Sequence, residues 1–186
     1  MNYNPITKIG NTSFYVVEGD ITQIPTDALM TAINSGGMWW GGIDRAIQRV
    51  AGNLYHNQAA KAFPLTNLQT VVAKGNTSKH KGQFNDVVFV VDDLETSVDK
   101  VVYAGLTAAH NEGYGSLLLP AIRLGVMSGV VEKTPQQTIN KIGEGISKFF
   151  KEYATQTSLE SITFVVYQDP LTVRNLGKGL ESLSLN

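Results

Sequence analysis

The sequence contains no cysteine, which excludes a disulfide scaffold, a thiolate zinc site and a cysteine nucleophile. Only three histidines are present, His56, His80 and His110, and their wide spacing argues against a metal site built from histidines. Charged residues are sparse at 17%, the formal net charge is −1, and no block of like charges interrupts that balance. We therefore expect no broad contact with nucleic acid or an anionic membrane, and the composition predicts no cofactor.

Long apolar runs are also missing, since the longest are the length of a β-strand and fall far short of a membrane span. The first residues lack the apolar segment of a signal peptide. Hydrophobic residues nevertheless make up 42% of the 186 residues, which suits one globular core and leaves too little chain for two. We expect a single domain over residues 1–186, a monomer, in the cytoplasm or, for a viral protein, in the host cytoplasm.

Short apolar segments alternate with helical patterns along the whole chain. Strands are predicted at 14–18, 27–33, 68–73, 87–91, 117–121 and 162–167. These segments are apolar on both faces, as is typical of strands covered by helices on two sides. Helices are predicted at about 42–52, 53–63, 98–109 and 135–153, and again after 169. The alternation predicts an α/β sandwich around a mixed, largely parallel sheet.

Glycine is frequent, with eighteen residues, and many glycines fall in loops at predicted strand ends. The loop at 34–44 (NSGGMWWGGID) runs from a strand directly into a helix. Its glycines allow backbone N–H groups to approach an anion, and the helix N-terminus adds partial positive charge. The pattern is compatible with a phosphate site and equally with a flexible loop that needs turns.

Two further strand ends carry candidate ligand contacts. The loop at 119–129 (LPAIRLGVMSG) again contains glycines, and its Arg123 either pairs with phosphate or forms a salt bridge at the surface. The segment 18–22 (EGDIT) follows the first predicted strand. Its Asp20 either accepts a hydrogen bond from the amino group of a base or caps a short helical turn.

The order of these motifs resembles the macrodomain family. The matching segments are GDIT at 19–22, DALMTAIN at 27–34, GGIDRAI at 41–47, LPAI at 119–122 and FVVY at 164–167. The resemblance covers about residues 14 to 169. It implies a three-layer α/β/α sandwich that binds ADP-ribose, free or attached to a protein. Some members of the family only bind this ligand, whereas others hydrolyse ADP-ribosyl linkages or remove groups from the distal ribose.

The resemblance also implies roles for individual residues. Asp20 would accept the adenine amino group, Ile21 would offer a backbone contact beside it, and Tyr167 would pack on the adenine face. Asn34 would hydrogen-bond the distal ribose, and Asp44 matches the acidic position that hydrolytic members place near that ribose. The diphosphate would lie between the amides of two loops: Gly41, Gly42 and Ile43 in the first, and Gly125, Val126 and Met127 in the second.

The chain departs from the family pattern around the distal ribose. Thr31 stands where the family often has an asparagine, and no aromatic residue accompanies Met127. Trp39 and Trp40 replace the first half of a run of four glycines. One of these rings either fills a gap beneath the loop or stacks on the ligand as a lid.

Three functions are compatible with these residues. A hydrolase would use Asp44 to orient or deprotonate water and Asn34 to position the substrate, although an acidic residue is also favoured in the first turn of any helix. A reader would bind ADP-ribose without turnover. An adaptor would have a cleft plugged by Trp39 or Trp40. His56 and His110 are expected to pack or lie at the surface, and His80 is expected in a solvated surface loop.

Overall fold

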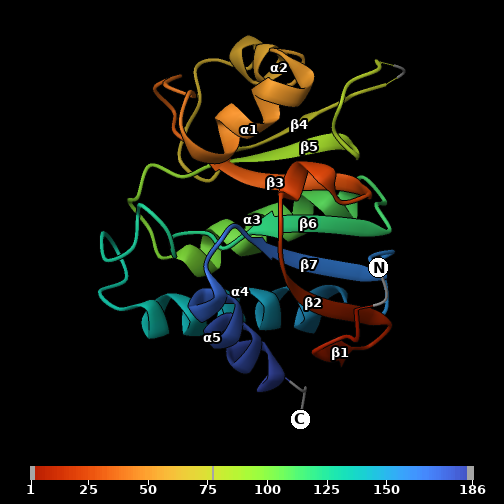
Figure 1. The fold of residues 1–186 in the computed structure, drawn as a ribbon, viewed down its shortest axis with the longest axis vertical. Coiled ribbons are helices and arrows are strands. Elements are labelled where there is room, and N and C mark those ends of the chain that lie inside the picture. Colours follow the sequence, from red (N-terminus) through yellow and green to blue (C-terminus); the bar gives the residue numbers. More distant parts are fainter. Residues whose placement is uncertain (1–2, 77, 184–186) are drawn as a thin grey trace.

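The computed structural model describes residues 3–76 and 78–183 and contains one seven-stranded sheet. Its strand order, β1-β2-β7-β6-β3-β5-β4, can be followed from bottom to top in Figure 1. The strands are β1 (Thr7–Ile9), β2 (Thr12–Glu18), β3 (Thr26–Ile33), β4 (Thr70–Ala73), β5 (Phe84–Val91), β6 (Ser116–Pro120) and β7 (Ser161–Val166). The helices are the 3-10 helix η1 (Ile21–Gln23), α1 (Gly42–Ala51), α2 (His56–Lys61), α3 (Val98–Asn111), α4 (Pro135–Tyr153) and α5 (Pro170–Glu181). None of the helices in these described ranges is long and apolar enough to cross a membrane.

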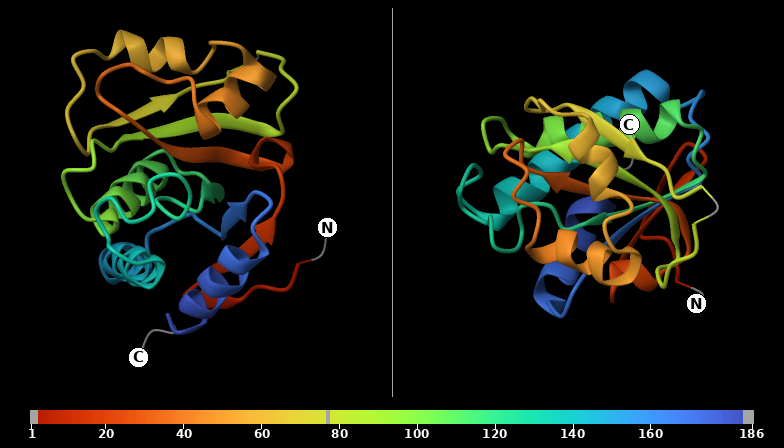
Figure 2. Two further views of the ribbon diagram at one scale, coloured as in Figure 1. Left: turned by 60° about the vertical axis from the view of Figure 1, so that its left-hand side comes forward. Right: turned by 90° about the horizontal axis from the view of Figure 1, so that it is seen from above.

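The sheet is mixed and mostly parallel, as predicted. β2, β7, β6, β3 and β5 pair in parallel, whereas β1 and β4, at the two edges, are antiparallel to their neighbours. One face is covered by α3, α4 and α5 and the other by α1 and α2, which confirms the three-layer α/β/α sandwich. The views in Figure 2 show α1 and α2 (orange) beside β4 and β5, and α5 (blue) beside β2 at the other end.

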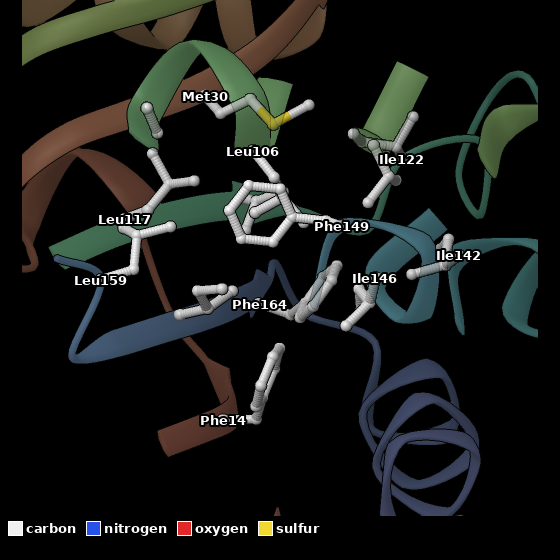
Figure 3. Packing of buried hydrophobic residues seen from close by; sticks show 14 of the residues in the cluster. Phe14, Met30, Leu106, Leu117, Ile122, Ile142, Ile146, Phe149, Leu159 and Phe164 are labelled. Atoms are coloured by element: carbon white, nitrogen blue, oxygen red, sulfur yellow. The ribbon is translucent and has the colours of Figure 1, made fainter. Parts of the chain in front are cut away.

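The two faces of the sheet carry separate hydrophobic clusters because side chains alternate along each strand. In β5, Val88 and Val90 join the cluster beneath α3 and α4, whereas Val87, Phe89 and Val91 join the cluster beneath α1 and α2. Figure 3 shows the first cluster, in which side chains from the helices and from the strands converge. This double burial explains why the strand segments are apolar on both faces.

All the predicted strands and helices are present, with bounds shifted by a few residues. Thr134 caps α4 by accepting a hydrogen bond from the N–H of Gln137, and Pro135 is the first helical residue. β1 was not predicted, because three residues are too few to show a period. It turns back onto β2 through Gly10, which has φ 59°.

The polar segment at 78–83 is a surface loop as predicted, with Lys79 and Lys81 exposed, but the half-buried ring of His80 is bonded to the fold at both nitrogens and is not freely solvated. The Tyr55 hydroxyl donates to the carbonyl of Asn85 at 2.7 Å and lies 2.8 Å from Nε2 of His80. The N–H of Gly82 donates to Nδ1 of the same ring at 3.0 Å. Burial lowers the pKa of His80 and raises the pKa of Tyr55 to about 12. A hydroxyl from the core therefore holds this loop in place.

A buried arginine joins the loops that follow β5 and β6. The side chain of Arg123 is only 2% exposed. Its Nε and Nη2 donate to the two carboxylate oxygens of Asp92 at 3.1 and 2.7 Å, and Nη1 donates to both oxygens of Glu132 at 3.1 and 3.0 Å. Nη2 also donates to the carbonyl of Thr96 at 2.7 Å, and Glu132 accepts from the N–H of Val98 at 2.8 Å. One side chain thus fixes the end of β5, the start of α3 and the segment before α4.

The network compensates for two unfavourable features of Arg123. Burial alone disfavours the charged guanidinium, but the hydrogen bonds and charges of Asp92 and Glu132 outweigh it and raise the pKa of Arg123 above its ordinary value. The residue also has φ 58°, a backbone conformation that is costly for a residue with a Cβ atom. The surrounding contacts therefore determine the path of this loop.

Replacing Arg123 with Met leaves Asp92 and Glu132 buried without their cation. Because removing one partner of a buried ion pair exposes the full desolvation cost of the other, we expect the free energy of unfolding to fall by about 3–5 kcal/mol. Urea denaturation measures this change. The control is Arg174→Met on the exposed side of α5, which should stay within about 0.5 kcal/mol of the wild type. Equal stability of the two variants would contradict the structural role of the network.

Candidate functional site

A cleft of about 1270 Å³ lies at the carboxyl ends of the parallel strands. Its walls are the ends of β3, β6 and β7, the loops that follow these strands, β2 and β5, the first two turns of α1 and the first turn of α5. Open α/β sheets bind ligands at this edge because loops and helix N-termini converge there. A smaller hollow of about 420 Å³ lies between α3 and β4 and contains none of the predicted site residues. The large cleft is therefore the candidate site.

The structure brings most of the predicted site residues together in this cleft. Those that line it are Asp20, Ile21, Asn34, Gly41, Gly42, Ile43, Asp44, Arg123, Gly125, Val126, Met127 and Tyr167. Trp39 and Trp40 are not among the lining residues. Segments far apart in the sequence meet here because parallel strands place their following loops at one edge of the sheet.

The two tryptophans have different surroundings. Trp39 is buried and stacks on the ring of Phe63 with centroids 5.6 Å apart, while its indole N–H donates to the carbonyl of Asn34 at 2.8 Å. Trp40 is 69% exposed. The interpretation in which a ring fills a gap beneath the loop is confirmed for Trp39. Neither ring lines or plugs the cleft, because Trp39 packs in the core and the exposed Trp40 lies outside the lining, so the expectation of a plugged cleft is wrong. The alternative of a lid that stacks on a bound ligand stays a prediction for Trp40.

The first loop leads into α1, whose N-terminus lies at the cleft and is not capped by a side chain. The N-cap residue of α1 is Gly41, which has no side chain to accept from the first N–H groups of the helix. Gly42 has φ 51° and Gly37 has φ 77°, and a Cβ atom on Gly37 would lie 2.9 Å from the ring of Phe63. The glycines thus stand where the backbone requires them. The free amides and the helix dipole suit an anion.

Asn34 and Asp44 both line the cleft, and each has a partner within the protein. Nδ2 of Asn34 donates to the carbonyl of Met38 at 2.9 Å, and its Oδ1 accepts from the N–H of the same residue at 3.2 Å. Oδ1 of Asp44 lies 2.9 Å from Nε2 of His56, which is buried as expected for a packing residue. The side chain of Asp44 remains 15% exposed. The cleft therefore contains a carboxylate that is accessible and anchored at one oxygen.

Asp20 and Tyr167 lie at the ends of the neighbouring strands β2 and β7. Oδ1 of Asp20 caps η1 by accepting from the N–H of Thr22 at 2.9 Å, and Oδ2 pairs with Arg49 at 3.1 Å. The capping alternative for Asp20 is thus confirmed, while Oδ2 remains on the exposed side of the turn. Tyr167 is 68% exposed, and Asp169 behind it caps α5. Hydrogen bonds from Thr172 lower the pKa of Asp169.

The second loop presents its backbone to the cleft, and its cation faces away. Arg123 lines the cleft, but its guanidinium donors are used by Asp92, Glu132 and Thr96. The expectation that this side chain pairs with phosphate is therefore wrong, and the salt-bridge alternative holds, although in a buried position. Val126 is 96% exposed at the rim of the cleft. This loop thus lines the cleft with glycine and apolar residues and without a free cation.

Several cleft residues were missed by sequence reasoning. Arg45 lines the cleft one helical turn before Arg49, so both cations lie on one face of α1. Asp93 lines the cleft and accepts from the N–H of Ser35 at 2.8 Å, which ties the first loop to the end of β5. The four-residue spacing of the arginines and the position of Asp93 after a parallel strand were the available signals. In the described ranges, no cluster of three His, Asp or Glu residues is arranged to hold a metal ion.

Comparison with curated proteins finds similarity along most of the chain, although no protein-family model matches it. The O-acetyl-ADP-ribose deacetylase of Citrobacter rodentium is 28% identical over 178 residues, which cover 87% of this chain and 92% of that protein. The O-acetyl-ADP-ribose deacetylase of Cronobacter turicensis is 31% identical over 127 residues, which cover 60% of this chain and 68% of that protein.

Comparison with solved structures gives the same architecture. The macrodomain of Trypanosoma brucei in complex with ADP-ribose has a TM-score of 0.75 at 21% identity and is matched over 95% of this chain and 73% of that chain. A mutant of the Oceanobacillus iheyensis macrodomain has a TM-score of 0.74 at 16% identity, with 95% of each chain covered. From the sequence relatives and the shared fold together, this chain belongs to the macrodomain family.

Proposed function

We propose that this protein binds ADP-ribose in the cleft and hydrolyses a bond at the distal ribose of its substrate. One observation supports this most strongly: the residues expected at the adenine, the diphosphate and the distal ribose all line a single cleft. At about 1270 Å³ the cleft exceeds the usual size of a small-molecule pocket, which suits an extended dinucleotide-like ligand.

The adenosine end is proposed to lie between η1 and the end of β7. Oδ2 of Asp20 would accept from the adenine amino group, taking over from its exposed ion pair with Arg49. The exposed ring of Tyr167 offers a planar apolar surface for the base. The buried side chain of Ile21 holds its backbone in place beside both residues.

The diphosphate is proposed to bind the uncapped start of α1 and the backbone of the second loop. Gly41, Gly42 and Ile43 line the cleft where the N–H groups of the first turn have no intrahelical partner. Gly125 and Val126 line the opposite loop, and a Cβ atom on Gly125 would meet nothing within 4 Å. Two anionic groups can therefore approach the backbone from both sides without a basic patch.

Hydrolysis is proposed to depend on Asp44. Its carboxylate would orient a water molecule and accept one of its protons, while the water oxygen attacks the carbonyl carbon of an acyl ester on the distal ribose. The ester C–O bond breaks, the proton returns to the departing ribose oxygen, and the products are ADP-ribose and a carboxylic acid. The same water could instead attack the anomeric carbon of an ADP-ribosyl linkage. The deacetylase names of the relatives favour the ester.

Recognition without turnover is the second candidate, and one observation favours it. The amide of Asn34, the group expected to position the distal ribose, is already bonded at both ends to the backbone of Met38. One N–H and one lone pair of the amide remain for a ligand, but only in the orientation that the two bonds to Met38 impose. A reader of ADP-ribosylated proteins would not need Asn34 to be oriented toward the reacting ribose, because binding alone does not require a reactive geometry.

The Asp20→Asn variant tests the adenine contact. It keeps an oxygen that can cap Thr22 but replaces the second acceptor with a donor, so we expect the affinity for ADP-ribose to fall about tenfold, or about 1.4 kcal/mol. Calorimetry measures the affinity. Asp99→Asn, the same change in the first turn of α3, should bind like the wild type. Wild-type protein that shows neither heat nor a thermal shift with millimolar ADP-ribose would overturn the proposed ligand.

The Asp44→Asn variant separates hydrolysis from binding. It keeps the size of the side chain and an oxygen facing His56 but removes the base. We expect kcat with O-acetyl-ADP-ribose to fall about 100-fold or more, with ADP-ribose affinity unchanged within about threefold. A mono-ADP-ribosylated protein serves as the second substrate, and Asp99→Asn again as the control.

The possible results lead to different conclusions. Wild-type protein that binds ADP-ribose but releases nothing from either substrate would establish the reader. Turnover by Asp44→Asn at the wild-type rate would show that another group acts as the base.

A further inference from the structure

A histidine that does not line the cleft is paired with the carboxylate that does. His56 is the first residue of α2 and is 4% exposed. Its Nε2 lies 2.9 Å from Oδ1 of Asp44, in the first turn of α1. The two helices follow one another on the same side of the sheet (Figure 1). The imidazole therefore contacts Asp44 from the core side, opposite the cleft.

The surroundings of the ring fix where its proton lies. Nδ1 of His56 is buried and has no hydrogen-bond partner in the described part of the chain. The neighbouring rings are those of Trp39 and Phe89, with centroids 5.9 and 5.0 Å away. A proton on Nδ1 would be a buried donor without an acceptor, whereas a proton on Nε2 has the carboxylate as its acceptor. The geometry thus favours the Nε2–H tautomer, which donates to Asp44.

This hydrogen bond makes the two carboxylate oxygens of Asp44 different from one another. Oδ1 of Asp44 is held by His56, and Oδ2 makes no hydrogen bond to any residue that the structure describes. Because the side chain is partly exposed and lines the cleft, Oδ2 is the oxygen left for a ligand or a water. A carboxylate anchored at one oxygen loses less rotational freedom when it engages the reacting group.

We propose that His56 is a positioning residue, which donates from Nε2 to Asp44 and holds the carboxylate in the orientation needed for hydrolysis. The proposal rests on the proposed function of Asp44. Trp39 contributes indirectly, because its buried ring packs beside the imidazole and helps to exclude water from Nδ1. Trp39, at a position where the family pattern has glycine, thus packs against the hydrogen bond between His56 and Asp44.

Two substitutions of His56 separate positioning from packing. His56→Met fills similar space without a donor, and we expect kcat to fall about tenfold or more with KM unchanged within about twofold, since a small displacement of a reacting group has an effect of this size. His56→Gln places an amide N–H near the position of Nε2, and we expect it to restore kcat to within about threefold of the wild type. His110→Met, the same change beside Phe149 and Tyr153 on the far helices, should leave both constants unchanged.

Thermal unfolding of every variant accompanies the kinetics. Unchanged kcat in His56→Met would overturn the proposal. The proposal would also be overturned if kcat fell equally in His56→Met and His56→Gln, in proportion to the loss of thermal stability. That result would show that His56 acts only through packing.

A spectroscopic measurement distinguishes failure of this proposal from failure of the proposed function. Long-range ¹H–¹⁵N NMR of the wild-type protein reports which imidazole nitrogen carries the proton, with the His56 signals assigned by their loss in His56→Met. We expect protonated Nε2 and unprotonated Nδ1. An Nδ1–H tautomer would overturn the hydrogen bond whatever the activity. Protonated Nε2 in a protein without turnover would retain the hydrogen bond and reject the hydrolysis, and with it the catalytic positioning.

Discussion

The neutralisation of one buried cation determines the geometry of the cleft. A guanidinium in the interior has to be paired on all its sides, since an unpaired buried charge is too costly for a domain of this size. Arg123 meets this requirement with Asp92, which precedes it by 31 residues, and Glu132, which follows it by 9. Both carboxylates belong to loops at the carboxyl edge of the sheet. The wall of the cleft opposite α1, which residues 124–127 line, is therefore fixed by charge pairing.

The helices that start at this edge of the sheet differ in whether a side chain caps them. Thr134 and Asp169 cap the starts of α4 and α5, so in each of these helices a side chain pairs with one of the first N–H groups. α1 starts at a glycine without such a cap and opens into the cleft. An anion at that position would pair with the first N–H groups of α1, as a capping side chain does in α4 and α5. The net charge of −1 is compatible with such a site, because backbone dipoles carry the attraction.

The sequence pattern predicts the layers of the fold and most residues of the cleft. It does not predict which side chains distant in the chain pair with one another. Apolar runs such as 87–91 identify strands buried on two faces, and parallel strands bring their loops to one edge. Nothing local distinguishes Trp39 from Trp40, because a loop has no period that assigns one ring to the core. Arg123 and its carboxylates, like Asp44 and His56, meet through the tertiary fold, and their separation in the chain hides them.

The antiparallel edge strands have a consequence for encounters between copies of the protein. A sheet of parallel strands would ordinarily end in rows of unpaired N–H and C=O groups that another chain can extend. Here β1 has three residues and β4 has four, and each pairs antiparallel to a longer strand inside it. A neighbouring molecule that meets the sheet edge-on finds too few free backbone groups to continue it. Where β1 covers Thr12–Phe14 of β2 and β4 covers Val87–Val90 of β5, the longer parallel strands are thereby kept out of intermolecular strand pairing.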